Sequence, residues 1–170
     1  MSKHFYKTQG FTLIELVATI AIAGILMAMT IPSFNSTITS SRITSYANDF
    51  VSALNLARSE AVRRGIPVSV SNNGTPTHWG ESGWTVVDAN GIILRVYTKL
   101  ANGYNLTNNG LYNNAVTYLS TGLTSVAGTT SSEVVFNLCK GIDMTTSRAI
   151  SIESVGRTHI SKAGNAASCP

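Results

Sequence analysis

The chain opens on a long apolar run that differs from everything after it. From Phe11 to Ile31 the sequence reads FTLIELVATIAIAGILMAMTI, and no charged residue lies between Glu15 and Arg42. A helix of this run is roughly 31 Å long at about 1.5 Å per residue, which matches the hydrocarbon core of a bilayer. The run therefore predicts a transmembrane half of an N-terminal helix over residues 11–32.

Beyond Pro32 the pattern becomes that of an amphipathic helix. We expect Pro32 to kink the helix rather than end it. Gly65 and Pro67 supply a stop, because glycine can take the left-handed backbone conformation and proline cannot continue a helix. The sequence thus predicts an amphipathic half over residues 33–65 that lies on a core. Its apolar stripe, spaced by three and four, is Ile43, Tyr46, Ala47, Phe50, Leu54, Ala57 and Ala61.

After Gly65 the period changes from helical to alternating, which indicates strands. The segment Asp88-Ala89-Asn90-Gly91 predicts a hairpin, since Asn-Gly tolerates the positive φ of a tight turn. We expect residues 66–170 to form one antiparallel β domain packed on the helix, an α+β fold. The expected strands are Val68 to Val70, Trp84 to Val87, Ile92 to Tyr97, Val116 to Leu119, Val134 to Leu138 and Ala149 to Ile152, with long loops at 72–82, 98–114 and 120–132.

The charge distribution predicts how the apolar run is oriented. Lys3 and Lys7 precede the run and no Lys or Arg follows until Arg42, so the positive-inside rule places residues 1–10 in the cytoplasm and the C-terminal domain across the membrane. Only 12% of the residues are charged, and the net charge is +4. Without the two N-terminal lysines, 10 basic residues face 8 acidic ones. A remaining charge of +2 is weak evidence for nucleic-acid binding.

Two simple interpretations of the apolar run meet difficulties. A cleaved secretory signal has an apolar region of about 7–15 residues and ends at small residues, and Ala28-Met29-Thr30 fits that pattern poorly. A plain membrane anchor does not explain Glu15, because an ionised carboxylate in hydrocarbon costs about 2.5–3.5 kcal/mol. A protonated carboxyl, the positive end of the helix dipole or a partner cation could each compensate for it.

The segment Gly10-Phe11-Thr12-Leu13-Ile14-Glu15, with a basic leader before it and an apolar stretch behind it, resembles the N-terminus of a type IV pilin or pseudopilin. This resemblance implies that residues 1–10 are a leader, that a prepilin peptidase cuts after Gly10, and that the new N-terminus, Phe11, is methylated. It also implies that Glu15 pairs with the Phe11 amine of a neighbouring subunit. The pairing is physically reasonable, because each charge buried alone would be unfavourable.

Three further segments resemble the FimT/FimU/GspH group of minor pilins and pseudopilins. They are residues 56–65 (LARSEAVRRG), residues 83–91 (GWTVVDANG) and the stretch from Arg148-Ala149-Ile150 to Gly156-Arg157. The resemblance is strongest to a FimU-like minor pilin, and implies a type IV pilin-like fold and a structural subunit that helps initiate or cap a pilus. The implied partners are the prepilin peptidase, the major pilin and other minor pilins. The implied location is the inner membrane, with the C-terminal domain in the periplasm, and then the pilus.

Two alternative functions follow from the same group. A DNA-binding FimT-like pilin is one, because Gly156-Arg157-Thr158-His159 partly matches the Gly-Arg-x-Arg motif of such proteins, and arginines clamp phosphates. His159 replaces the second arginine and would be mostly neutral at pH 7, and Arg157 could equally serve a turn. A GspH-like pseudopilin of a type II secretion system is the other alternative. The candidate DNA-binding residues are Arg148, Arg157, His159 and Lys162.

The sequence predicts no catalysis, metal or cofactor. His4, His78 and His159 lie far apart, without cysteine or carboxylate at ligand spacing, and no nucleotide-binding motif is present. Cys139 and Cys169 are the two cysteines. They predict a disulfide in a periplasmic domain and two inert thiols otherwise. Such a bridge would contribute roughly 3–4 kcal/mol on the chain-entropy model.

Overall fold

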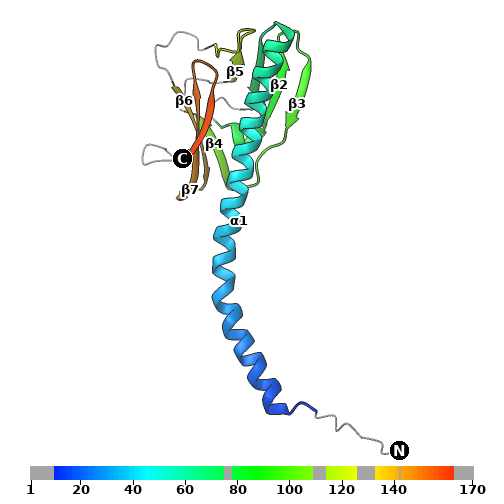
Figure 1. Cartoon of the computed structure of the whole chain (residues 1–170), viewed down its shortest axis with the longest axis vertical. Helices are drawn as coiled ribbons and strands as arrows, with labels where there is room; N and C mark the ends of the chain where they lie inside the picture. The colour runs from blue at the N-terminus through cyan, green and yellow to red at the C-terminus, as the bar shows by residue number, and fades with distance from the viewer. Residues whose placement is uncertain (1–9, 75–77, 109–113, 126–132, 142, 163–170) are drawn as a thin grey trace, which may run out of the picture. The chain divides into compact units, whose positions relative to one another are not determined.

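The computed structural model of the chain (Figure 1) describes residues 10–74, 78–108, 114–125, 133–141 and 143–162, without the side chains of residues 28–34, 133 and 143–145. Over these residues the elements follow in the order α1, β1, α2 and then β2 to β8. The chain divides into two compact units, residues 1–38 and residues 39–170. The boundary between them lies within α1, which spans Leu13–Arg64.

The first unit consists of the N-terminal part of α1. The helix continues through Pro32 without interruption. In the residues that the structure describes, no helix carries an apolar stretch long enough to cross a membrane. The span predicted for residues 11–32 is therefore not confirmed. Large apolar side chains of this unit are exposed, among them Phe11, Leu13, Ile14, Leu16, Val17, Ile20, Ile22, Ile25, Leu26, Met27 and Ile38.

In the second unit α1 buries the predicted apolar stripe. Every member is fully buried except Tyr46, which is partly buried and packs against the core, and Ala53 is buried as well. The helix ends at Arg64 because Gly65 takes a φ of 69°, in the left-handed region, while its N–H still donates to the Ala61 carbonyl at 3.0 Å. The buried stripe from Ile43 to Ala61 and the helix stop follow the predicted pattern, whereas residues 35–38 of the predicted amphipathic half are exposed.

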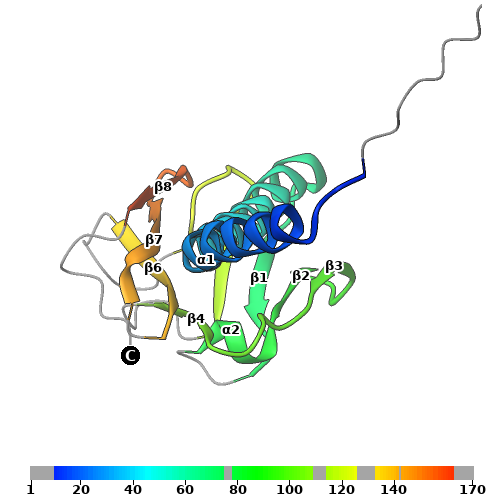
Figure 2. The ribbon, with the colours of Figure 1, turned by 90° about the horizontal axis from the view of Figure 1, so that it is seen from below.

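Two antiparallel sheets of four strands each pack against this part of α1. Residues of both sheets share one core with this part of α1, and Figure 2 shows β1, β2 and β3 on one side of the unit and β4, β6, β7 and β8 on the other. The first sheet has the order β3-β2-β1-β5, with strands Ile93–Tyr97, Trp84–Asp88, Val68–Asn72 and Ala115–Tyr118. The second has the order β4-β6-β7-β8, with strands Tyr104–Asn108, Glu133–Lys140, Asp143–Glu153 and Thr158–Lys162.

Phe50 of α1 lies at the centre of an aromatic cluster that joins the sheets. Its ring centroid lies 5.2 Å from that of Trp84 on β2, 4.8 Å from Phe136 on β6 and 5.7 Å from Trp79. Trp79 begins α2, a short helix over Trp79–Ser82. Both tryptophans are fully buried. Edge-to-face and tilted pairs of this kind add stability beyond the area that they bury.

A charged corner joins the end of α1 to the β2–β3 hairpin. The Glu60 carboxylate accepts hydrogen bonds from Arg63 at 2.5 Å and from Arg64 at 2.6 Å, and Arg64 also contacts Asp88 at 3.0 Å. Asp88 is buried and accepts the backbone N–H groups of Asn90 and Ile92, both at 2.9 Å. The carboxylate oxygens of Asp88 therefore accept hydrogen bonds from both the β2–β3 turn and α1.

The hairpin at residues 88–91 is confirmed, with one difference. Gly91 has a φ of 80°, but Asn90 does not take a positive φ, and Gly91 donates its N–H back to the Asp88 carbonyl at 2.9 Å. The turn thus needs only one residue in the left-handed region.

Three elements were not predicted. The short helix α2 falls in the segment expected to be the loop 72–82, and β4 falls in the expected loop 98–114. The third is β8, which follows the last predicted strand. The expected loop 120–132 lies mostly outside the described residues.

The charged corner predicts how stability depends on pH. Hydrogen bonds from Arg63 and Arg64 lower the pKa of Glu60 from 4.5 to about 2. A lowered pKa means that the contribution of Glu60 is complete above pH 4.5 and is lost as the pH falls toward about 2. In urea unfolding of the full chain in detergent, the midpoint of Glu60→Gln should therefore lie below that of the unsubstituted chain at pH 7, and the two should converge as the pH falls.

Asp49→Asn is the matched control for this measurement. Asp49 is an exposed α1 carboxylate that forms no ion pair with the described residues. If Asp49→Asn shifts the urea midpoint as much as Glu60→Gln does, the pH-dependent stability cannot be assigned to the charged corner.

Candidate assembly site

The first turn of α1 holds Glu15 in a capping box. The backbone N–H and the hydroxyl of Thr12 each donate to Glu15 Oε2 at 2.9 Å, and the Glu15 N–H donates back to the Thr12 hydroxyl at 3.3 Å. Thr12 precedes Leu13, the first helical residue, so Thr12 is the N-cap and Glu15 lies at the third helical position. The contacts direct the carboxylate toward the N-terminal end of the helix.

The predicted cleavage position lies directly before this box and is open to solvent. Gly10 and Phe11 are exposed, and a Cβ added at Gly10 would meet nothing within 4 Å. The backbone of Gly10 has no positive φ. Packing within the described chain therefore does not require glycine here, and any requirement for it must come from a partner that binds this segment.

The arrangement brings together the three residues that the sequence singled out. Gly10, Phe11 and Glu15 lie within the first helical turn and the residues just before it. Cleavage after Gly10 would place an ammonium at Phe11, beside the positive end of the helix dipole. A cation at Phe11 would be unfavourable beside the positive end of the helix dipole, so a nearby carboxylate would become more stabilising. Sequence reasoning missed Thr12, although its Thr-x-x-Glu spacing is the usual signature of a capping box.

The four candidate DNA-binding residues do not form one surface. Arg148 and Lys162 are register partners on β7 and β8, so they share a face of the sheet, whereas His159 lies three residues from Lys162 and points to the opposite face. Arg157 lies in the turn between the strands and pairs with Glu153 at 3.1 Å. This spread does not favour phosphate binding by the four together.

Gly156, which precedes Arg157, has a packing role. Its φ is 78°, and a Cβ added there would lie 2.2 Å from the Gly122 carbonyl oxygen. The side chain of Arg58 on α1 ties the same region together, because it donates to the carbonyls of Gly122 and Val155, both at 3.0 Å. Gly156 in this chain therefore belongs to the contact between the helix and two turns.

Cys139 is fully buried on β6 and is not a free thiol. Its predicted partner, Cys169, lies outside the described residues. The bridge between these two cysteines stays a prediction.

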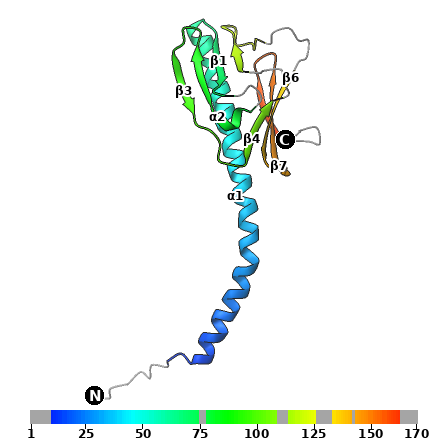
Figure 3. The same ribbon diagram turned by 180° about the vertical axis from the view of Figure 1, so that it is seen from behind.

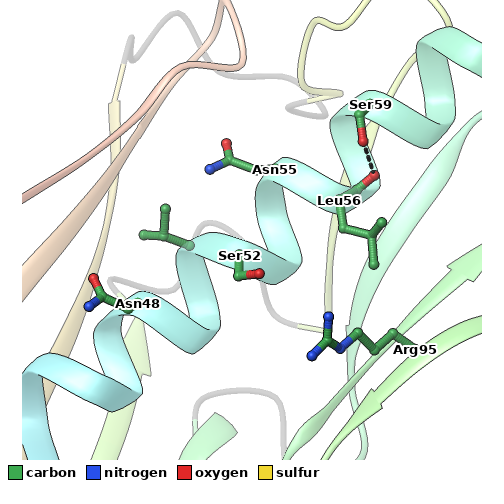
Figure 4. A pocket seen from close by; sticks show the side chains of 7 residues that line it. Asn48, Ser52, Asn55, Leu56, Ser59 and Arg95 are labelled. Carbon is green, nitrogen blue, oxygen red and sulfur yellow. Dashed lines mark hydrogen bonds between the residues drawn. The ribbon is translucent and has the colours of Figure 1, made fainter.

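A shallow groove lies between α1 and β3 (Figure 4). It holds about 590 Å³, and Arg95 is the titratable group among its lining residues. Ser59 donates its hydroxyl to the Leu56 carbonyl at 2.9 Å, and the lining residues include no His, Asp, Glu or Lys that could act as its base. In the part of the chain that the structure describes, no three His, Cys, Asp or Glu side chains are grouped to hold a metal ion. The remaining lining residues are Asn48, Val51, Ser52 and Asn55.

Two family models match the sequence. Residues 46–156 match the model described as type II transport protein GspH, and residues 6–31 match the prokaryotic N-terminal methylation motif. The first match covers more than half of the chain and includes the C-terminal part of α1, from residue 46 on, with most of both sheets. The chain belongs to the GspH family. No curated protein matches this GspH-family chain.

Two solved structures resemble this GspH-family chain, both of the type IV minor pilin FimU of Pseudomonas aeruginosa. One is 25% identical, covers 71% of this chain and 89% of the FimU chain, and gives a TM-score of 0.61. The other is 24% identical, covers 69% and 91%, and gives a TM-score of 0.58. The predicted resemblance to the FimT/FimU/GspH group and the α+β type IV pilin-like fold are confirmed. With the methylation motif, these findings show a FimU-like minor type IV pilin and do not favour the two alternatives.

The packing at Gly156 generates a stability prediction. Gly156→Ala should destabilise the full chain by roughly 3 kcal/mol, because the new Cβ adds a clash with the Gly122 carbonyl to the cost of a left-handed conformation. Urea unfolding followed by tryptophan fluorescence measures this, since Trp79 and Trp84 are both buried.

Gly91→Ala is the matched control. Gly91 has a similar φ of 80°, but a Cβ there would meet nothing within 4 Å. It should cost only about 1 kcal/mol, from the backbone conformation alone. Equal losses for the two variants would show that the contact with Gly122 contributes nothing.

Proposed function

We propose that this FimU-like minor pilin helps initiate or cap pilus assembly after prepilin peptidase cuts behind Gly10 and Phe11 is methylated. The observation that carries the proposal is the methylation motif over residues 6–31, placed on the start of α1 in front of a GspH-family domain. In this proposal the precursor is anchored in the inner membrane with its C-terminal domain in the periplasm. The mature subunit then joins the major pilin and other minor pilins.

The charge at Glu15 is the proposed determinant of subunit addition. In the single chain its carboxylate is exposed and its hydrogen bonds come from Thr12, a neutral residue. These bonds satisfy the oxygen, but among the described residues the negative charge of Glu15 has no counter-ion. An ammonium on a neighbouring Phe11 would supply one, and pairing becomes more favourable as helices pack and exclude water.

The role that we propose is structural rather than enzymatic. The family is one of pilin subunits. The groove beside α1 brings no nucleophile and base together among its lining residues. The Glu15 carboxylate and the exposed apolar side chains of α1 are both suited to contacts between subunits.

Glu15→Gln separates the charge of Glu15 from its capping role. Glutamine can also complete a capping box, so the helix start is kept while the charge is removed. If the charge drives assembly, the amount of this chain in sheared pili should fall about tenfold or more, as expected for loss of a poorly solvated ion pair. Immunoblots of pili and of membranes measure it, with Glu81→Gln, an exposed acid on α2, as the control.

Gly10→Val tests processing without disturbing packing. The open space around Gly10 means that valine should leave the fold intact while it blocks a peptidase that requires a small residue. We expect the uncut precursor in membranes and none in pili, while the unsubstituted chain begins with methylated Phe11 by mass spectrometry. A mature chain with any other N-terminus, or normal pilus levels of Glu15→Gln, would contradict the proposal.

A further inference from the structure

An exposed apolar surface lies at the C-terminal end of α1. Val62 of α1, Leu119 and Leu123 beside Gly122, and Val155 in the β7–β8 turn are exposed by 55, 36, 44 and 51%. We call these four residues the Gly122 patch. Figures 1 and 3 show the end of α1, the end of β5 and the turn at the tip of β7 at the same end of the second unit. Clusters of this kind, with a polar rim, mark protein contacts.

The segments that carry the four side chains are held together around Gly122. A Cβ added at Gly122 would lie 3.3 Å from Val62, and Leu119 accepts the N–H of Gly122 and donates its own N–H to Leu123 at 2.8 Å. Thr124 donates its N–H to the Ser154 carbonyl, which fixes this turn against the β7–β8 turn. The patch is therefore centred on Gly122.

Arg58 holds the three segments of the patch in one arrangement. Its guanidinium donates to the carbonyls of Gly122 and Val155 and so links α1 to both turns. Gly122 and Gly156 both take a positive φ, and an added Cβ at Gly156 would clash with Gly122. A surface that is ordered before binding loses little conformational entropy when a partner docks.

The rim of the patch presents positive charge. Arg63 follows Val62 and Arg157 follows the turn, and their side chains are 66 and 73% exposed. Their partners, Glu60 and Glu153, are only 16 and 31% exposed. The complementary surface is therefore apolar at its centre and acidic at its rim.

The described residues of the second unit give a second copy of this chain no such surface. The other exposed aliphatic cluster of the described second unit is Ile92, Ile93 and Val96 at the β3 edge. Arg95 lies in that strand and, among the described residues, has no carboxylate partner. Contact between the two clusters would bring arginines together, which disfavours self-association.

We propose that the Gly122 patch binds the globular domain of a different pilin-type subunit, through an apolar surface with an acidic rim. The inference rests on the proposed function, because open fibres are built from head-to-tail contacts in which each subunit uses two different surfaces. Glu15 serves the helix contacts near one end of α1. The Gly122 patch serves a globular contact at the other end.

The first test places a carboxylate in the patch. Val155→Asp and Leu123→Asp in the full chain should lower its amount in sheared pili about tenfold or more, because the contact would bury an unpaired charge. Val96→Asp, at a side chain 59% exposed on β3, is the matched control and should stay within about twofold. Unchanged tryptophan fluorescence of each variant in detergent establishes that it is folded.

The second test identifies the occupant. A photo-crosslinking amino acid at position 155 of the full chain should crosslink to a pilin that has a methylated N-terminus. The crosslink should lie in the globular domain of that pilin. The Glu15→Gln substitution should abolish the crosslinked product. A second copy, a partner without that N-terminus, or a crosslink that survives Glu15→Gln would overturn the inference. Normal levels of the Val155→Asp variant in pili would also overturn the inference. Absence of the unsubstituted chain from pili would instead overturn the proposed function.

Discussion

Phe50 contacts one aromatic ring from each layer of the second unit, and the arrangement of that unit depends on this contact. Trp84 belongs to the first sheet, Phe136 to the second, and Trp79 to the short helix between β1 and β2. A single α1 side chain therefore sets the spacing of both sheets against the helix. Alanine residues at 47, 53, 57 and 61 let the strands approach closely on either side of it.

The helix and the hairpin were predictable because their signals are local. The stripe from Ile43 to Ala61 repeats at helical spacing, and Gly65 can end the helix with no help from tertiary structure. The elements that were not predicted depend instead on tertiary contacts. In β4, YNLTN is rich in polar residues and becomes a strand by pairing with β6, while β8 is an edge strand whose outward residues carry no burial signal.

In the candidate site, too, some roles can be predicted from neighbouring residues in the sequence and others depend on the tertiary structure. Glu15 stands out as an acid in an apolar run, and its capping partner is three residues away, so both could be read from the sequence. The basic residues near the C-terminus are close along the chain but divide between two faces of a sheet and a turn. The register between β7 and β8 divides the strand residues between the two faces of the sheet. The role of Gly156 likewise depends on Gly122 and Arg58, which are remote in sequence.

The cap on α1 bears on what the proposed cleavage after Gly10 would do to the molecule. Every atom of that cap belongs to Thr12 or Glu15, on the C-terminal side of Gly10. If the chain is cleaved after Gly10 as proposed, loss of the leader would leave the first turn with the same Thr12–Glu15 hydrogen bonds. The cleavage would introduce a cation without requiring the helix to refold. The proposed mature subunit would therefore be ready to dock once it has been trimmed.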